Sequence, residues 1–492
     1  MLGMLNPSII DALRQAVDAN SGGLPSGIIT APNQLQTYEC DGLTNFRTIP
    51  SAVVLPRTAE QVQAVVRVCA QHKIPFVARG SGTGLSGGAL PVEGGIVISF
   101  ARMNRILEID IPNQRVVVEP GVINAHVTDA VAAHGYFYAP DPSSQSVCSI
   151  GGNVAENAGG AHCLKYGFTT THVLSLDVVL PTGELVTFGS AAPDAPGYDL
   201  TGVFVGSEGT LGVATRITLR VVKRPQTVQV LLAAFDSIAA AGQAVSDVIA
   251  AGMLPAALEI MDKLSAKASE AAVHPNYPVC EALLLIELDG PEAEVQAQML
   301  EANAICQQAG AWEIRLAQTA QERGLIWKGR KAAFAAMGRI SPNYIVQDGV
   351  IPRTALPVVL ETITRMATEA QLRVANVFHA GDGNLHPMVL YDQAIPGQED
   401  LAMELSHHIL RVCVDHGGSI TGEHGVGKEK QDAMSYMFTE PDLDTMHRVR
   451  HAFDPQDIAN PDKLFPRPRL CAEKPGPYIP HPLEAAGIAE FF

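Results

Sequence analysis

Short apolar runs separated by polar turns dominate the first 225 residues of the chain. Residues 52–57 are typical of a short strand. Thr58 and Gln61 have the spacing of a capping box, which predicts a helix over 59–73. An apolar strand at 74–78 follows directly, so this region begins as a β-α-β unit and leads into a glycine-rich loop.

Two β-hairpins are predicted after that loop. The runs ILEID and RVVVEP are joined by IPNQ, and the runs SLDVVL and LVTF are joined by a turn at 181–184. A last strand is expected within residues 205–222. Residues 1–225 therefore predict an α+β unit built from short strands.

The pattern changes after Pro225, where helical and strand periods alternate up to Gly417. Their order favours a ferredoxin-like antiparallel sheet with its helices on one face. Further helices are expected at about 354–371 and 398–416. The predicted segments are 1–47, 48–225, 226–425 and 426–492, of which the last is a helical tail that packs back on the second.

Composition narrows the class of protein. The chain has 492 residues, 47% of them hydrophobic and 17% charged, which fits two or three domains with a large core. A net charge of −17 argues against nucleic-acid and anionic-lipid partners. Eight scattered cysteines without a CxxC pair exclude the common iron–sulfur spacings and a zinc ribbon, and indicate free thiols in a reducing cytoplasm. We expect neither a secretory signal nor a transmembrane helix.

The glycine-rich stretch at 75–95 is the first candidate for chemistry. Its glycines leave backbone N–H groups uncovered, so the main chain can approach a phosphate closely. Gly82, Gly84 and Gly87 match the dinucleotide fingerprint, but that fingerprint requires a helix directly behind it. Another turn and strand follow instead, which favours a different diphosphate-binding loop over a Rossmann site. A turn-rich linker is the alternative for this stretch alone.

A second candidate is the sequence FHAGDGNLHP at 378–387. Gly-Asp-Gly-Asn is a natural four-residue turn, which predicts that Ala380 faces Leu385 and that His379 faces His386. Directly opposed residues have Cβ atoms roughly 4.5–5.5 Å apart. Two imidazoles at that separation can share one zinc or manganese ion.

A third ligand is available in the sequence GEHG, where Glu423 offers a carboxylate and His424 another imidazole. The alternative is that these histidines are ordinary polar loop residues. GEHGVGKE also mimics a phosphate-binding Walker loop, but Glu429 stands where a hydroxyl should hold magnesium, so a nucleotide triphosphatase is rejected.

Arg330 lies in a predicted helix beside two lysines. A guanidinium is the natural holder of a substrate carboxylate, although a solvated charge run explains the cluster equally well.

Together these stretches resemble one family. The segments PRTAEQV, ARGSGTGLSGGA, PDPSSQ, SIGGNVAENAGG, GSEGTLGVATRITL, FHAGDGNLHP, TGEHGVGKEK and NPDKLFP are similar to the FAD-linked D-2-hydroxyacid dehydrogenases, of the glycolate oxidase FAD-subunit and D-lactate dehydrogenase type. The resemblance runs in order from about residue 48 to 466. It implies the vanillyl-alcohol-oxidase or p-cresol-methylhydroxylase (PCMH) fold, in which an FAD domain of two α/β subdomains (48–225, with the tail 426–492) carries a cap domain (226–425).

The resemblance also implies an FAD site. Its residues are Arg79, Gly80, Ser81, Gly82, Thr83, Gly84, Ser86 and Gly87 at the pyrophosphate; Pro140, Asp141, Ser143, Ser144, Gly151, Gly152, Asn157 and Gly160 along the cofactor; Glu208, Gly209, Gly212 and Val213 on the adenine side; and Asn460 at the flavin. Because the loop lacks the histidine that some relatives link to the ring, FAD is expected to be non-covalent, although His162 and Cys163 remain without an assigned place.

For the metal and the substrate, the resemblance assigns His379, His386 and Glu423 as ligands, His424 as the catalytic base, Arg330 as the carboxylate clamp and Asn384 as a further substrate contact. The metal, zinc or manganese, lowers the pKa of the substrate hydroxyl, the base takes its proton, and the hydride moves to flavin N5.

The expected reaction is oxidation of glycolate or D-lactate to the 2-oxo acid. Relatives specific for 2-hydroxyglutarate carry a lysine where this chain has Val346, and an apolar residue leaves a distal carboxylate unpaired. Electrons are expected to leave to a quinone, a soluble acceptor or an iron–sulfur subunit, from a cytoplasmic protein peripheral to the inner membrane face that forms a homodimer. The alternatives are a D-2-hydroxyglutarate dehydrogenase, a flavin-free metallohydrolase and a non-redox flavin scaffold.

Overall fold

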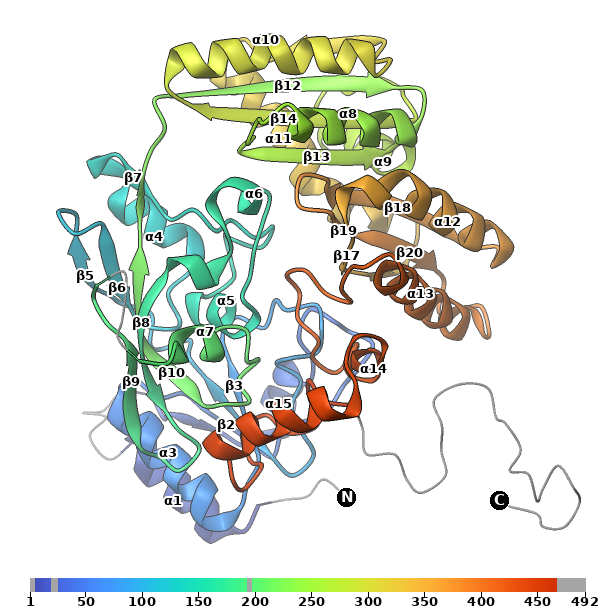
Figure 1. Ribbon diagram of the computed structural model, residues 1–492. Helices are drawn as coiled ribbons and strands as arrows, with labels where there is room; N and C mark the ends of the chain where they lie inside the picture. Colours follow the sequence, from blue (N-terminus) through green and yellow to red (C-terminus); the bar gives the residue numbers. More distant parts are fainter. Residues whose placement is uncertain (1–4, 19–24, 193–196, 467–492) are drawn as a thin grey trace, which may run out of the picture.

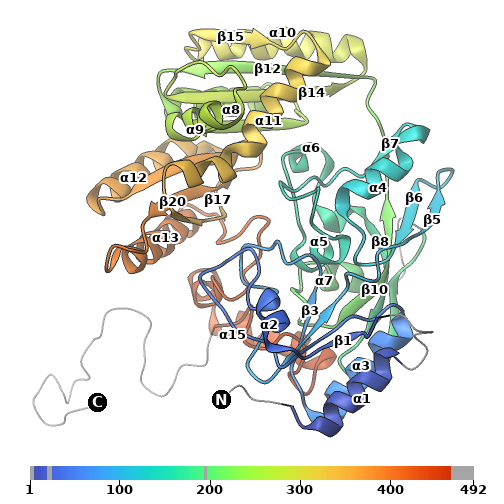
Figure 2. The same cartoon turned by 180° about the vertical axis from the view of Figure 1, so that it is seen from behind.

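The computed structural model describes residues 5–18, 25–192 and 197–466 (Figure 1). The chain up to β11 (Val222–Lys223) forms the lower half in Figure 1, and the chain from β12 (Thr227–Phe235) to α13 (Gln398–Asp415) forms the upper half. The view from behind in Figure 2 shows the same division. Helices and sheets occur in both halves, which confirms the predicted α+β class.

The first sheet of the lower half is built as the sequence pattern predicts. In spatial order its strands are β1 (Ile28–Ile29), β2 (Ala52–Val54), β4 (Ile96–Ser99) and β3 (Phe76–Arg79), with β2, β4 and β3 parallel. Helices α1 (Pro7–Asp18) and α3 (Ala59–His72) pack against each other, and their apolar residues share one core with this sheet. The Thr58 hydroxyl caps α3 by accepting the Gln61 N–H at 3.3 Å, so the predicted helix start is confirmed. A short helix, α2, spans Pro32–Leu35.

The second sheet of the lower half contains both predicted hairpins. Its order is β5 (Ile106–Asp110), β6 (Arg115–Val118), β10 (Val213–Arg220), β8 (Val173–Val179) and β9 (Leu185–Gly189), and all its neighbours are antiparallel. The helices here are α4 (Asn124–Val131), α5 (Ile150–Glu156), α6 (Cys163–Tyr166) and α7 (Leu200–Phe204), while β7 (Tyr136–Phe137) pairs with β11.

The upper half is one large antiparallel sheet. In order its strands are β15 (Glu313–Leu316), β12, β14 (Ala282–Gly290), β13 (Ala257–Asp262), β18 (Arg373–His379), β19 (Asn384–Leu385) and β17 (Gly349–Val350), with β20 (Pro387–Tyr391) beside β18 and β16 (Asn343–Val346) beside β20.

Helices cover both faces of this sheet, so the expectation of helices on one face is wrong. Leu231 and Ala233 of β12 lie in the core with α8 (Ile238–Ala250), α10 (Glu292–Gln308), α12 (Leu356–Glu369) and α13. Val230 and Leu232 point the other way, to α9 (Lys263–Val273) and α11 (Ala320–Ala336). A strand buried on both faces reads as a continuous apolar run, which is how VLLAAF and LLLI appear in the sequence.

After the upper half the chain returns to the lower one. Helix α14 (Met434–Met437) packs with Leu410 of α13, and α15 (Glu440–Phe453) lies beside the lower half in both views. Ala459 forms a β-bridge with Phe76 of β3. The Asn460 side chain donates to the backbone carbonyls of Gly88, at 2.8 Å, and of Glu208, at 2.6 Å. Residues 459 and 460 therefore hold β3 and the glycine-rich loop in place through backbone and side-chain hydrogen bonds.

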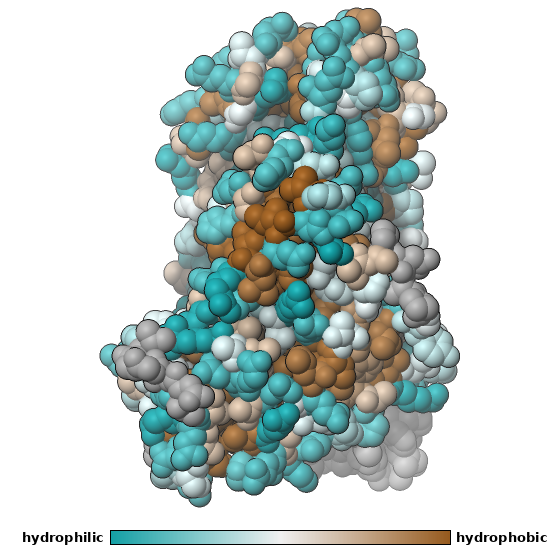
Figure 3. Space-filling model, turned by 90° about the vertical axis from the view of Figure 1, so that its left-hand side faces the viewer, coloured by the Kyte–Doolittle hydropathy of each residue, from teal (hydrophilic) through white to brown (hydrophobic). Residues whose placement is uncertain are grey.

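The surface is polar with local apolar groups. Figure 3 shows apolar residues gathered in the middle and lower parts of one side of the molecule. The edge strands β5 and β9 expose Leu107, Ile109 and Leu185. Within the described residues, no helix combines the length and apolar character that crossing a bilayer requires.

Candidate functional site

The β18–β19 hairpin brings the two predicted histidines together, though in a different register from the one expected. His379 pairs with Asn384, so the loop is 380–383 and His379 does not face His386 directly. Because side chains alternate along a strand, His386 lies two positions beyond Asn384 on the same face as His379. The two imidazole centroids are 5.1 Å apart. The predicted opposition of His379 and His386 is thus wrong, while their proximity holds.

Glu423 completes this cluster from a distant segment. Its Oε1 lies 3.3 Å from His379 Nε2 and 3.4 Å from His386 Nε2. One ligand atom from each of these residues lies within 4.8 Å of the other two, in a largely buried position. Two imidazole nitrogens and a carboxylate oxygen converging in this way form a donor set suited to a divalent ion of the zinc or manganese kind.

Asp348 holds the loop that carries Glu423. Its Oδ2 accepts the backbone N–H of Gly422 at 3.0 Å and of His424 at 2.8 Å, and the Thr421 hydroxyl at 2.6 Å. Its Oδ1 lies 3.3 Å from His386 Nε2. Burial alone would raise the pKa of Asp348, but the neighbouring cationic groups and these hydrogen bonds hold it well below its usual value. An ionised carboxylate thus ties the 421–424 loop to the hairpin.

Glu259, on β13, links the predicted clamp to the predicted ligand set. It accepts from His379 Nδ1 at 2.7 Å and from Arg330 Nε at 2.7 Å, and Arg330 Nη2 lies 2.6 Å from the same oxygen. All three side chains are buried. A carboxylate behind a ligating histidine fixes the ring orientation and leaves Nε2 facing the ligand cluster. Glu259 accepts the Arg330 Nε–H, whereas the buried Nη2 makes no hydrogen bond of acceptable geometry among the described residues.

His424 stands at the open side of the cluster. Its ring stacks on His386 with centroids 4.9 Å apart, and its buried Nδ1 has no hydrogen-bond partner among the described residues. Burial lowers the pKa of His424 to about 4, which keeps the imidazole neutral. Burial opposes ionisation of Glu423, but the hydrogen bond and charge of His379, with His386 beside it, outweigh burial and lower the pKa of Glu423 to about 2. The cluster therefore presents an anionic ligand and a neutral imidazole.

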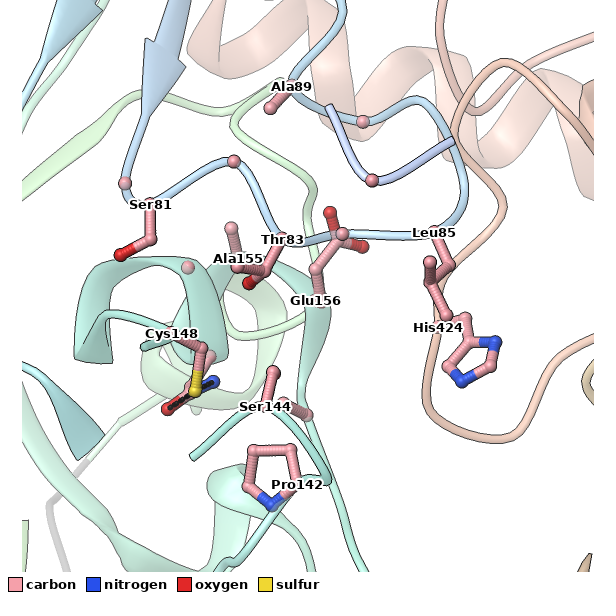
Figure 4. Close-up of a pocket in the computed structure, with 18 of the residues that line it drawn as sticks. Ser81, Thr83, Leu85, Ala89, Pro142, Ser144, Cys148, Ala155, Glu156 and His424 are labelled. Carbon is pink, nitrogen blue, oxygen red and sulfur yellow. Dashed lines mark hydrogen bonds between the residues drawn. The ribbon is translucent and has the colours of Figure 1, made fainter. Parts of the chain in front are cut away.

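A cavity of about 630 Å³ runs from the glycine-rich loop to this cluster. Figure 4 shows Ser81 and Thr83 on one side, Pro142, Ser144 and Cys148 opposite, and His424 at the far end. Of the predicted residues, those on its wall are Arg79, Gly80, Ser81, Gly82, Thr83, Gly84, Ser143, Ser144, Gly151, Gly152, Glu208, Gly209, Gly212, Val213, His386, Glu423 and His424.

The loop fits a diphosphate. The backbone N–H groups of residues 81–84 donate to no acceptor within the described ranges, so they are free for a ligand. A Cβ at Gly80 would collide with the Ser149 hydroxyl, and Gly82 has a φ of 69°, a backbone conformation that favours glycine. Exposed N–H groups on a glycine loop are the donor set that a diphosphate needs.

The remaining predicted residues do not reach the wall. They are Ser86, Gly87, Pro140, Asp141, Asn157, Gly160, Asn460, His379, Arg330 and Asn384. Two of them support wall residues instead: Asn460 donates to the carbonyls of Gly88 and Glu208, and Asp141 pairs with Lys331 at 3.8 Å.

Sequence reasoning gave no role to Glu259, Asp348, Glu156 or Lys331. Glu259 could have been noticed, because it is a single charged residue inside the apolar run ALEIM. Such a residue in a buried strand needs a partner. Its partners are 71 and 120 positions away, and no local pattern indicates them.

Comparisons with known proteins agree with this arrangement. Residues 50–189 match the family described as FAD binding domain, and residues 224–464 match FAD linked oxidases, C-terminal domain. Glycolate oxidase subunit GlcD of Escherichia coli K12 is 50% identical over 475 residues, covering 96% of this chain and 94% of that protein. The Bacillus subtilis protein of the same name is 40% identical, covering 89% and 94%.

The fold is also found among solved structures. p-Cresol methylhydroxylase with substrate bound superposes with a TM-score of 0.78 at 18% identity, covering 93% of this chain and 96% of that one. This confirms the predicted PCMH-type fold. The free N–H groups of the glycine loop, the matching family descriptions and the close relatives together show that the chain belongs to the FAD-linked oxidases, in the FAD-dependent 2-hydroxyacid dehydrogenase family.

Proposed function

We propose that the protein oxidises a small D-2-hydroxy acid, glycolate or D-lactate, to the 2-oxo acid with FAD and a divalent metal. The proposal rests on where the possible metal ligands lie relative to the glycine loop. The cluster of His379, His386 and Glu423, with His424 beside it, lies at the end of the cavity that begins at the glycine loop. Glycolate is also the substrate named in the GlcD relatives.

The chain's own residues supply binding and proton transfer. His424, which lines the cavity beside the cluster, would accept the substrate hydroxyl proton. Arg330 lies behind the cavity wall, where Glu259 orients it, and would meet the substrate carboxylate through a guanidinium N–H that Glu259 does not accept. A zinc or manganese ion held by His379, His386 and Glu423 would lower the pKa of the substrate hydroxyl. FAD, when bound, supplies the hydride acceptor.

Non-covalent attachment of FAD is part of the proposal. Both imidazole nitrogens of His162 are engaged, Nδ1 with Asp141 at 3.0 Å and Nε2 with Glu287 at 3.0 Å. Cys163 is buried and is not on the cavity wall. Neither residue is therefore placed to form a bond with the ring.

The cavity wall favours a short monocarboxylate. Val346 and Phe334 line it, Phe334 with its ring 5.7 Å from that of His386, and neither side chain offers a partner to a second carboxylate. Lys331 also lines the cavity, but its ammonium lies 3.8 Å from Asp141. A D-2-hydroxyglutarate dehydrogenase is the second candidate, because a protein of that name from Stutzerimonas stutzeri is 31% identical over 474 residues.

We further propose that electrons leave to a quinone or to a partner iron–sulfur subunit, since the cysteines of this chain are scattered. The exposed apolar residues on β5 and β9 fit contact with a partner protein or a second copy. A cytoplasmic protein peripheral to the inner membrane face would meet either acceptor.

The test is anaerobic bleaching of the flavin by glycolate, D-lactate, L-lactate and D-2-hydroxyglutarate. The proposal expects bleaching by the first two and a stoichiometric divalent metal in the purified protein. Faster bleaching by D-2-hydroxyglutarate would establish the second candidate. A colourless protein with bound zinc would indicate a metallohydrolase, and a yellow protein that no hydroxy acid bleaches would indicate a non-redox scaffold.

A further inference from the structure

Two carboxyl groups meet behind the glycine loop, at a place to which the mechanism assigns no role. Glu156 is the last residue of α5 and lines the cavity, and Figure 4 shows its side chain between the glycine loop and α5. Glu208 approaches it from the loop before β10. A Cβ at Gly425 would collide with the carboxylates of both, so the glycine makes room for the pair.

The two groups have different surroundings. Glu208 accepts the backbone N–H of Val426 at 2.7 Å and of Gly427 at 2.6 Å, and Lys430 and Lys463 face it. Glu156 has no such donors, and its buried Oε2 lacks a hydrogen-bond partner within the described chain. Burial raises the pKa of Glu208, but the hydrogen bonds and the lysines oppose that shift and make Glu208 the more readily ionised of the two. For Glu156, Lys430 alone among its described charged neighbours favours the charged form.

A neutral Glu156 follows from these contacts. Burial is the largest effect that raises the pKa of Glu156, and the negative charges of Glu208 and Asp41 add to it, whereas Lys430 acts in the opposite direction. Two carboxylates that share a buried site cannot both ionise cheaply. The proton therefore resides on Glu156.

We propose that Glu156 is a carboxylic acid that donates a hydrogen bond to an acceptor atom of bound FAD. Its Oε1 lies 3.8 Å from the position that a Cβ would take at Gly84, within the loop whose free N–H groups fit the diphosphate. The phosphate oxygens and the ring carbonyls are both acceptors, so a protonated carboxyl complements either, whereas a carboxylate would repel the diphosphate. The inference rests on FAD binding and not on the identity of the substrate.

The test measures the Kd of FAD for the full-length protein between pH 6 and 10 from flavin fluorescence. In the wild type we expect the Kd to rise by about tenfold per pH unit once Glu156 loses its proton. Glu156→Gln keeps a donor that cannot ionise, so its Kd should stay low and lack this rise. Glu156→Leu has no donor, and its Kd should be raised at every pH.

Glu208→Gln provides an independent check. Removing the neighbouring negative charge makes Glu156 easier to ionise, so the rise in Kd should begin at a lower pH than in the wild type. Other groups also titrate in this pH range, and their effect on the Kd is the same in the wild type and in Glu156→Gln. It therefore cancels when the two pH profiles are compared. These groups are the flavin, Asp41, Lys430 and Lys463. A second readout is the infrared carbonyl band of a protonated carboxylic acid, which should be lost in Glu156→Gln.

Identical pH profiles in the wild type and Glu156→Gln, or an unchanged carboxylic acid band, would overturn the proposal. Failure to bind FAD at any pH would instead contradict the cofactor assignment itself. The two failures are therefore distinguishable.

Discussion

At the scale of single residues, the metal assignment depends on His386, whose Nε2 faces both Glu423 and Asp348. His386→Ala should lose the divalent metal, measured by mass spectrometry, and lose turnover by at least about a hundredfold. The flavin should stay bound with an unchanged visible spectrum. His416→Ala, at an exposed histidine, is the control and should keep both. Retention of a full metal complement by His386→Ala would refute the ligand role.

Arg330 has two neighbours of different kind, the proposed substrate and the buried Glu259. Arg330→Ala should raise KM by about tenfold to a hundredfold, because a charge-assisted hydrogen bond is worth roughly 1.5–3 kcal/mol. The kcat should also fall, since Glu259 is left without its cation and His379 is less well oriented. Steady-state kinetics measure KM and kcat, and the Arg339→Ala variant, at an exposed arginine, is the control. An unchanged KM would exclude Arg330 as the carboxylate holder.

At the scale of elements, one carboxylate holds the loop of residues 421–424 against the hairpin. Asp348→Asn preserves shape but weakens the bonds to Thr421, Gly422 and His424. We expect a loss of about 2–4 kcal/mol in unfolding free energy and a weaker metal site, because a buried network is disrupted. Thermal unfolding with and without added zinc measures both. If stability and metal affinity both match the wild type, the loop has another anchor.

The β18–β19 hairpin shows which features of an element the sequence predicts and which it does not. The turn residues and the two histidines predicted the element, but the register was wrong by two residues. A shift of two leaves every side chain on its original face, so the two histidines still lie close together, and their role as ligands stays a prediction. The hairpins at β5–β6 and β8–β9, and the cap at Thr58, were predicted because their signals are local. Glu259 and Asp348 were missed because their partners are brought near only by the complete fold.

At the scale of the whole molecule, His162 joins the two halves. It bridges Asp141 of the lower half and Glu287 of the upper half, and Trp327 donates to Glu287 at 2.6 Å. Burial would lower the pKa of His162, but the two carboxylates raise it well above its usual value. The raised pKa means that this bridge contributes fully below about pH 6.5, the ordinary value for histidine, and weakens as pH rises through the higher folded-state value.

His162→Gln should therefore lower the Tm most in mild acid, and the difference from the wild type should shrink as pH increases. The exposed His134→Gln variant should show no such trend. Thermal unfolding from pH 6 to 9 provides the measurement. A difference that grows with pH would mean that His162 is neutral in the folded protein.

The return of the chain after the upper half has a consequence for how such proteins can be re-engineered. Ala459 and Asn460 complete the cofactor half only after the whole upper sheet has been traversed. The upper half is thus inserted between two segments of the chain that pack together in the lower half. A fragment that stops where the upper half begins would keep every glycine of the loop yet lack the amide that braces it.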